Sequence, residues 1–218
     1  MATYQTEEEQ IASIKRWWEV NGKFVIIGLI VVIATAVGTR AWQDFELSAV
    51  TKASAQYDLM MQELEAGKLD SVVQRGAEII KSNPDLQYSV LSAMLIAKVE
   101  VEKGNNDAAF QRLSWALEKT KSEKMKHIIR IRLAKVLLAQ GKLNEALTHA
   151  TFPQQGDFAS QYSVIQGDVY VKKGEAASAK TAYTAALNDK SMGSQLRNFV
   201  QIKLDDLGEI EIGNETGK

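Results

Sequence analysis

A run of sixteen residues without a charged side chain, from Phe24 to Thr39, lies near the start of the chain. A helix that crosses a bilayer core about 30 Å thick needs about 20 residues, because each residue adds about 1.5 Å. The run reaches this length if Arg40 extends its charge toward the lipid headgroups and Trp42 is included. The sequence therefore predicts a transmembrane helix over residues 24–42. The residues that we single out in it are Phe24, Gly28, Ala34, Gly38 and Thr39.

A cleaved signal peptide is the alternative to this anchor. The Ala34–Ala36 segment resembles the small-x-small pattern at which signal peptides are cut, and the apolar stretch before it has a suitable length. A signal peptide, however, normally begins with a short basic segment. Here residues 1–23 precede the apolar run and carry four glutamates. These features favour an anchor that is retained.

The basic residues around the anchor indicate its direction. Lys15, Arg16 and Lys23 precede the segment, whereas Arg40 and Lys52 follow it. Lys and Arg are enriched on the cytoplasmic side of membrane helices, and acidic residues contribute little to this rule. The count of three against two predicts a cytoplasmic N-terminus.

The residues before the anchor have the pattern of an amphipathic helix. The Thr6–Glu9 segment fits a capping box at a helix N-terminus. Apolar side chains then recur at helical spacing from Ile11 to Trp18, and Asn21-Gly22 is typical of a helix end. Two interpretations stay open. In the first, the segment is a short helix that lies on the cytoplasmic membrane surface or docks on a partner protein. In the second, it is a continuation of the anchor helix.

Glycines at nearly constant intervals indicate internal repeats in the remainder of the chain. Gly67, Gly104, Gly141 and Gly174 are separated by 37, 37 and 33 residues, and an alanine follows five residues after each of the last three. The tetratricopeptide repeat has a period of about 34 residues and joins two antiparallel helices. We therefore predict an all-α fold, a tetratricopeptide-like α-solenoid of about four helical pairs with a capping helix around residues 196–204. A generic helical bundle is the alternative.

The first helix of each pair lines the concave surface of such an array. Counting back from each turn glycine predicts the following groove residues: Leu91, Met94, Lys98 and Val101; Ile128, Ile131, Lys135 and Leu138; Gln161, Val164, Asp168 and Val171. This face is more apolar than a solvated surface, which is typical of a protein-binding site. The groove is either open to a protein segment or filled internally by another helix, such as the one that contains Tyr57 and Leu64.

No arrangement of residues in the sequence indicates catalysis, a cofactor or a bound metal. The chain has no cysteine, and we expect its two histidines, His127 and His149, at the surface or near helix ends. No phosphate-binding glycine loop or nucleophile motif is present. The 26 Lys and Arg residues are balanced by 27 Asp and Glu residues, which gives no basic face for nucleic acid. We expect a non-enzymatic protein without catalytic, cofactor-binding or metal-binding residues.

Several segments together carry a resemblance to a known family: Ile14–Trp18, Asn21–Lys23, Arg40–Trp42, Ser54–Tyr57, Ile131–Ala134 and Ile202–Leu204. In these segments the chain resembles the YfgM family of ancillary SecYEG translocon subunits. The resemblance implies a single-pass protein of the bacterial inner membrane, with a cytoplasmic N-terminus and periplasmic repeats. It also implies association with the SecYEG translocon and with a membrane-anchored periplasmic chaperone of the PpiD type. The implied role is to pass newly translocated client proteins to periplasmic chaperones.

The predicted organisation has four parts. A cytoplasmic segment with a short amphipathic helix covers residues 1–23, the transmembrane helix 24–42, the periplasmic tetratricopeptide-like domain 43–207, and a disordered polar tail 208–218. Two functions fit this organisation. One is a membrane-tethered adaptor that binds clients in an open groove. The other is a structural scaffold or envelope-stress regulator of the inner membrane that does not bind clients.

Overall fold

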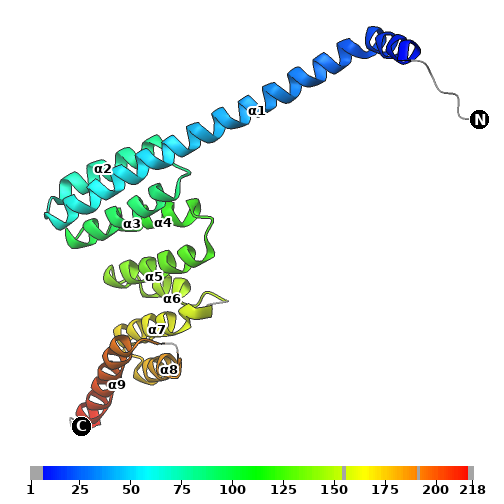
Figure 1. The fold of residues 1–218 in the computed structure, drawn as a ribbon. Coiled ribbons are helices and arrows are strands. Elements are labelled where there is room, and N and C mark those ends of the chain that lie inside the picture. Colours follow the sequence, from blue (N-terminus) through cyan, green and yellow to red (C-terminus); the bar gives the residue numbers. More distant parts are fainter. Residues whose placement is uncertain (1–6, 154–155, 191, 216–218) are drawn as a thin grey trace, which may run out of the picture. The chain divides into compact units, whose positions relative to one another are not determined.

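The structure is a computed structural model that describes residues 7–153, 156–190 and 192–215. Within these residues the chain forms nine α-helices and one short 3₁₀ helix, with no strand (Figure 1). The chain divides into two units, Met1–Lys52 and Ala53–Lys218. The first helix, α1 (Glu7–Glu65), contributes residues to both units.

The first unit consists of the N-terminal part of α1, which presents apolar side chains on all sides. The large apolar residues within 24–37 have 42–65% of their surface exposed. The hydroxyls of Thr35 and Thr39 donate to backbone carbonyls of the preceding turn, 2.8 and 3.0 Å away. Their polar groups are therefore bonded inside the helix, as hydrocarbon surroundings require. This helix is long and apolar enough to cross a membrane.

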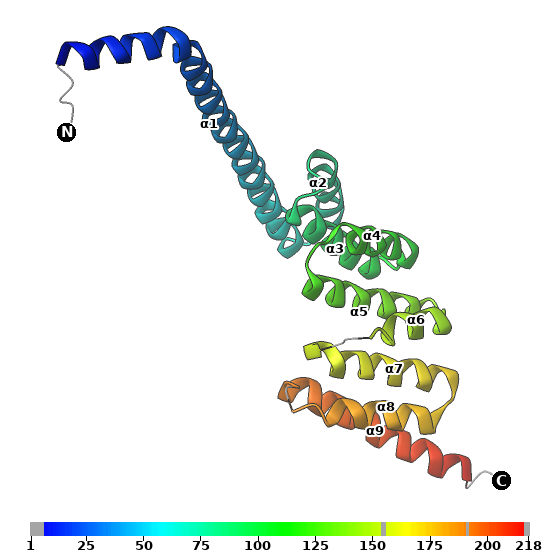
Figure 2. The same cartoon turned by 90° about the vertical axis from the view of Figure 1, so that its right-hand side faces the viewer.

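The helix continues through Asn21-Gly22, where the sequence predicts an end. The Asn21 side-chain amide donates to the carbonyl of Trp17 at 3.0 Å, and the Trp18 ring lies against Gly22. A glycine inside a helix costs about 1 kcal/mol but does not end the helix by itself. The segment before the anchor is thus helical and joins the anchor within α1, and Figure 2 shows that the blue N-terminal part of α1 bends relative to the part that follows. The cap predicted at Thr6 lies outside the described residues.

The second unit is an array of antiparallel helix pairs. The end of α1 pairs with α2 (Leu69–Ser82), α3 (Gln87–Glu102) with α4 (Asn106–Lys119), α5 (Glu123–Ala139) with α6 (Leu143–Ala150), and α7 (Ala159–Lys173) with α8 (Ala176–Leu187). A 3₁₀ turn, η1 (Gly156–Phe158), precedes α7, and α9 (Ser194–Glu215) follows α8. Figures 1 and 2 both show α2 to α9 stacked in chain order. The predicted all-α solenoid of four pairs and a capping helix is confirmed.

The repeat glycines form the turns between the two helices of each pair. Gly67, Gly104, Gly141 and Gly174 have φ angles of +69°, +79°, +73° and +75°. Residues with a Cβ atom adopt this left-handed conformation only at a cost. At the first turn, the N–H groups of Gly67 and Lys68 donate to carbonyls three and five residues earlier, which completes the hydrogen bonding at the end of α1. The alanines five residues after the later glycines, Ala109, Ala146 and Ala179, are fully buried.

Two glycines inside helices make room for a large side chain of the neighbouring helix. A Cβ atom at Gly167 would lie 2.3 Å from Cε1 of Tyr183, and a Cβ atom at Gly76 would lie 2.6 Å from Cε of Met60. Both distances are shorter than atoms can approach, and both large side chains are buried. Tyr183 thus explains why a glycine stands at position 167, and Met60 explains the glycine at position 76.

The last helix, α9, covers the final pair as the sequence predicts. Val200 and Leu207 are buried in the core that contains Tyr183, whereas the other side of the helix is exposed. The helix continues through Gly208 to Glu215, within the segment that the sequence predicts as a polar tail. Leu207 holds the helix on the core, and one glycine does not end it. Residues 216–218 lie outside the described residues.

Replacing Gly167 with alanine is expected to destabilise the folded protein by about 1–3 kcal/mol, the usual cost of overpacking a core. The added methyl group meets the Tyr183 ring, whose hydroxyl is held by a hydrogen bond to Asp168. Thermal unfolding of the full chain in detergent, followed by circular dichroism, measures the loss. The matched control is Gly208→Ala, whose methyl group meets nothing within 4 Å and should leave the midpoint unchanged or raise it. Equal midpoints for Gly167→Ala and the wild type would contradict this packing argument.

Candidate protein-binding groove

A pocket of about 430 Å³ opens between α3, α4 and α5. Most of its lining side chains are apolar: Met94, Ala97 and Val101 of α3, Leu113 of α4, and Val136 and Ala139 of α5. The others are polar or charged: Lys98, Glu102, Asn106, Arg132 and Lys135. Sites that bind ligands commonly measure about 300–1,000 Å³ and combine apolar walls with a few polar groups. This pocket has both properties.

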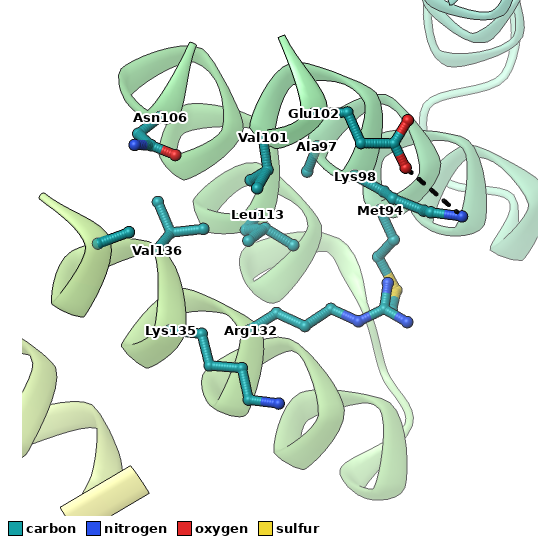
Figure 3. A pocket seen from close by; sticks show the side chains of 11 residues that line it. Met94, Ala97, Lys98, Val101, Glu102, Asn106, Leu113, Arg132, Lys135 and Val136 are labelled. Atoms are coloured by element: carbon teal, nitrogen blue, oxygen red, sulfur yellow. Dashed lines mark ion pairs between the residues drawn. The ribbon is translucent and has the colours of Figure 1, made fainter. Parts of the chain in front are cut away.

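Charged side chains from α3 and α5 border the pocket (Figure 3). Lys98 pairs with Glu102 over 3.7 Å, one turn along α3. The side chains of Arg132 and Lys135 of α5 form neither a hydrogen bond nor an ion pair with any residue in the described part of the chain. The pocket therefore combines an apolar interior with an excess of positive charge at its edge.

The structure brings four of the predicted groove residues, Met94, Lys98, Val101 and Lys135, into the lining of this pocket. Leu91 and Ile128 are half-buried outside it, and Gln161 is exposed outside it. Leu138, Asp168 and Val171 instead line a second pocket.

Ile131 and Val164 differ from the prediction, because their side chains lie in hydrophobic cores. They are only 6% and 7% exposed. Each belongs to a cluster of buried residues from several helices, Ile131 beside Tyr162 and Val164 beside Tyr183. A helix in the middle of the array has neighbours before and after it, so part of its predicted concave face is covered.

The helix that contains Tyr57 and Leu64 does not line the pocket between α3, α4 and α5. These two side chains pack against the first core, which contains Val72 and Ile96. The end of α1 therefore acts as the first helix of the first pair.

Sequence reasoning missed several lining residues, above all Arg132, Leu113 and Ala139. Arg132, Lys135 and Ala139 recur at intervals of three and four, which places them on one face of α5, and this spacing was a usable signal. Leu113 belongs to α4, the second helix of its pair. Counting only first helices could not find it.

The second pocket, of about 350 Å³, lies among α5, α7, α8 and α9. At this pocket the Asp168 carboxylate accepts a hydrogen bond from the Tyr183 hydroxyl at 2.6 Å and another from the Lys203 ammonium at 2.5 Å. Burial, followed by the interaction with Asp168, raises the pKa of Tyr183, because both disfavour the phenolate. These three side chains join α7, α8 and α9, so they hold the capping helix on the last pair.

His127 is half-buried near the start of α5, close to a helix end as the sequence predicts. Its ring stacks on Phe158 at 5.0 Å between centroids and meets Phe152 edge-on, and its Nδ1 lies 3.0 Å from the Tyr162 hydroxyl oxygen. These aromatic side chains close over the ring. His149 lies half-buried in the last turn of α6, where burial lowers its pKa. Within the described ranges, no group of three or more acidic or histidine side chains is placed to hold a metal ion.

Known proteins share this architecture. The chain matches the tetratricopeptide repeat-like domain family over residues 15–209, so the fold and the sequence define the same class of protein. It is 30% identical over 211 residues to a Haemophilus influenzae protein named "Ancillary SecYEG translocon subunit". That alignment covers 95% of this chain and 100% of the relative.

Two further relatives carry the same name. The Neisseria gonorrhoeae protein is 27% identical over 210 residues, and the Escherichia coli protein is 26% identical over 208 residues. Each alignment covers 95% of this chain, with 100% and 99% of the respective relative. The chain belongs to the family of ancillary SecYEG translocon subunits, and the resemblance noted in the sequence is confirmed.

Raising the pH above the ordinary pKa of tyrosine, 10.0, is expected to destabilise the protein through Tyr183. Because the pKa of Tyr183 is raised in the folded state, the folded chain keeps the phenolic proton at pH values where the unfolded chain releases it. This contribution to stability is complete below pH 10.0 and is lost as the pH rises further. Urea unfolding at pH values from about 9 to about 11 should show a steeper loss of unfolding free energy in the wild type than in Tyr183→Phe.

The control for this comparison is Tyr170→Phe, a half-buried tyrosine of α7 without a hydrogen bond to its hydroxyl among the described residues. It should keep the wild-type slope. Parallel curves for the wild type and Tyr183→Phe would show that the hydrogen bond to Asp168 does not control the titration.

Proposed function

We propose that this protein is a non-enzymatic, membrane-tethered adaptor of the Sec translocon. Relatives matched over nearly their whole length are named ancillary SecYEG translocon subunits. Repeat arrays of this class commonly bind other proteins along an extended concave surface. The observation that carries the proposal is the combination, in one chain, of an exposed apolar helix and a mainly apolar pocket on the repeat array.

In the proposed topology, the chain crosses the inner membrane once, with a cytoplasmic N-terminus and a periplasmic repeat domain. The excess of basic residues before the anchor supports this direction. Trp17 and Trp18 precede the apolar segment and Trp42 follows it, at the depths where indole rings favour the membrane boundary. This arrangement puts the repeat domain on the side where translocated chains emerge.

The adaptor captures newly translocated client proteins and passes them to periplasmic chaperones, with a membrane-anchored chaperone of the PpiD type as a partner. A tether raises the local concentration of the groove near an emerging chain, so weak contacts are sufficient. Weak binding also permits release to the next chaperone. The resemblance to the family supports these partners, and the pocket supports the capture step.

A scaffold or envelope-stress regulator without client binding is the alternative function. It needs the anchor and the translocon contact but not an accessible pocket. The exposed fraction of 43% for Val101 inside the pocket favours the adaptor, since a scaffold has no need of exposed apolar surface there.

Single-cysteine labelling tests the topology, because the chain has no cysteine of its own. Lys180→Cys on α8 is expected to react with a membrane-impermeant maleimide in intact spheroplasts. Ser13→Cys is expected to react only after the membrane is permeabilised. Both positions are solvent-exposed in the structure, so accessibility is limited by the membrane alone. The reverse labelling pattern would overturn the orientation.

Site-specific photocrosslinking in cells tests the partners. A photoreactive residue at Ile27 or Val37, both more than half exposed, is expected to crosslink to SecYEG subunits. The same residue at Val101, in the pocket, is expected to crosslink to a client whose translocation has been stalled. The control is Thr184, an exposed residue of α8 outside both pockets. If Val101 captures no more client than Thr184 while the anchor positions still capture SecYEG, the chain is a scaffold.

A further inference from the structure

We propose that the pocket between α3, α4 and α5 binds a protein segment in which an apolar side chain lies next to an acidic one. The apolar wall holds the first side chain, and Arg132 and Lys135 bind the carboxylate of the second. This inference rests on the proposed function, because it names the chemical class of segment that the adaptor takes.

The apolar part of the site is accessible as well as enclosed. Leu113 is 2% exposed and Met94 5%, so both are fixed by the core, whereas Val101 is 43% exposed. All three line the pocket. An apolar side chain that enters the pocket contacts the fixed side chains of Leu113 and Met94, and it also shields Val101 from water. Burial of such surface contributes about 25 cal/mol per Å².

The charge of the site is one-sided. Three cationic side chains, Lys98, Arg132 and Lys135, line the pocket together with one carboxylate, Glu102. Glu102 pairs with Lys98 at 3.7 Å. Arg132 and Lys135 thus remain without a counter-charge among the residues that the structure describes.

The surroundings of Arg132 do not neutralise it. Tyr57 of α1 is the group that acts on it electrostatically, and burial raises the pKa of Tyr57, so this phenol is uncharged at neutral pH. Arg132 is itself exposed to solvent, so an incoming anion can reach its guanidinium. A cation without a counter-charge is stabilised by a hydrogen-bonded carboxylate.

A carboxylate side chain suits this position better than other anions that a client segment can offer. The planar guanidinium of Arg132 presents two parallel N–H groups that match the two oxygens of a carboxylate. Lys135 lies one turn further along the same face of α5 and can donate to the same group. A neutral apolar segment leaves both cations unpaired, and a basic segment is repelled. The site therefore selects acidic and apolar residues together.

The test uses the full chain in lipid nanodiscs and fluorescein-labelled decapeptides. One peptide carries leucines alternating with glutamates. In the second peptide, glutamine replaces each glutamate, and in the third peptide, lysine replaces each glutamate. In the fourth peptide, serine replaces each leucine. Fluorescence anisotropy is expected to show about tenfold tighter binding for the Leu–Glu peptide than for the Leu–Gln peptide, as a charge-assisted hydrogen bond provides. The difference in affinity between the two peptides should shrink at about 1 M salt, where the Debye length falls to about 3 Å.

The double variant Arg132→Gln and Lys135→Gln is expected to abolish the preference for glutamate over glutamine while it still binds the Leu–Gln peptide. The matched control, Lys124→Gln and Lys180→Gln, changes the net charge equally at exposed lysines outside the pocket and should keep the preference. Val101→Ser should weaken the binding of both leucine peptides. Empty nanodiscs exclude binding to lipid.

The outcomes separate this inference from the proposed function. Equal affinities for the Leu–Glu and Leu–Gln peptides, or a preference that survives in the double variant, would refute the acidic selectivity and leave a purely apolar adaptor site. Tighter binding of the Leu–Lys peptide would also refute it. If no peptide binds and Val101 captures no client in cells, then client binding itself is refuted, and the selectivity falls with it.

Discussion

Two helices can pack closely only where one of them carries a small side chain at the contact, and the repeat array depends on this constraint. Gly167 accepts the ring of Tyr183, and Gly76 accepts Met60. Ala97 precedes its turn glycine, Gly104, by seven residues, as Gly167 precedes Gly174, and it is buried in the core and also lines the pocket. The residue that lets the helices approach therefore leaves the space in which a ligand can lie. Packing and binding share the same small side chains.

The helix α1 has two different kinds of surroundings along its length. Up to Lys52, the apolar residues of α1 are exposed on all sides, which suits lipid around 24–39. From Ala53 onward they occupy one face, with Ala53 and Met60 buried and separated by two helical turns. The division of the chain into two units falls at this change of pattern. Burial and hydrophobic periodicity thus both change where the second unit begins, at Ala53.

Much of the fold could be predicted from the sequence, because turn glycines and contact alanines are imposed by the local backbone. The pocket was harder to predict. Ile131 and Val164 share the apolar character expected of a groove, but neighbouring helices cover them, and only the packed array decides which apolar residues stay accessible. His127 looked isolated in the sequence, yet Phe158 stacks on it from a segment about thirty residues away. Long-range contacts of this kind leave no periodic signal.

The stacking of the helices in chain order has a consequence for how the protein forms. Each main contact in the array joins consecutive helices, from α2 with α3 through α8 with α9, with an added contact between α5 and α7. The core around each early helix is therefore completed by helices that are close to it in the sequence. In the proposed topology, each pair can therefore fold as soon as the next one has crossed the membrane. The exposed apolar end of the growing stack moves forward with synthesis until α9 arrives and closes it.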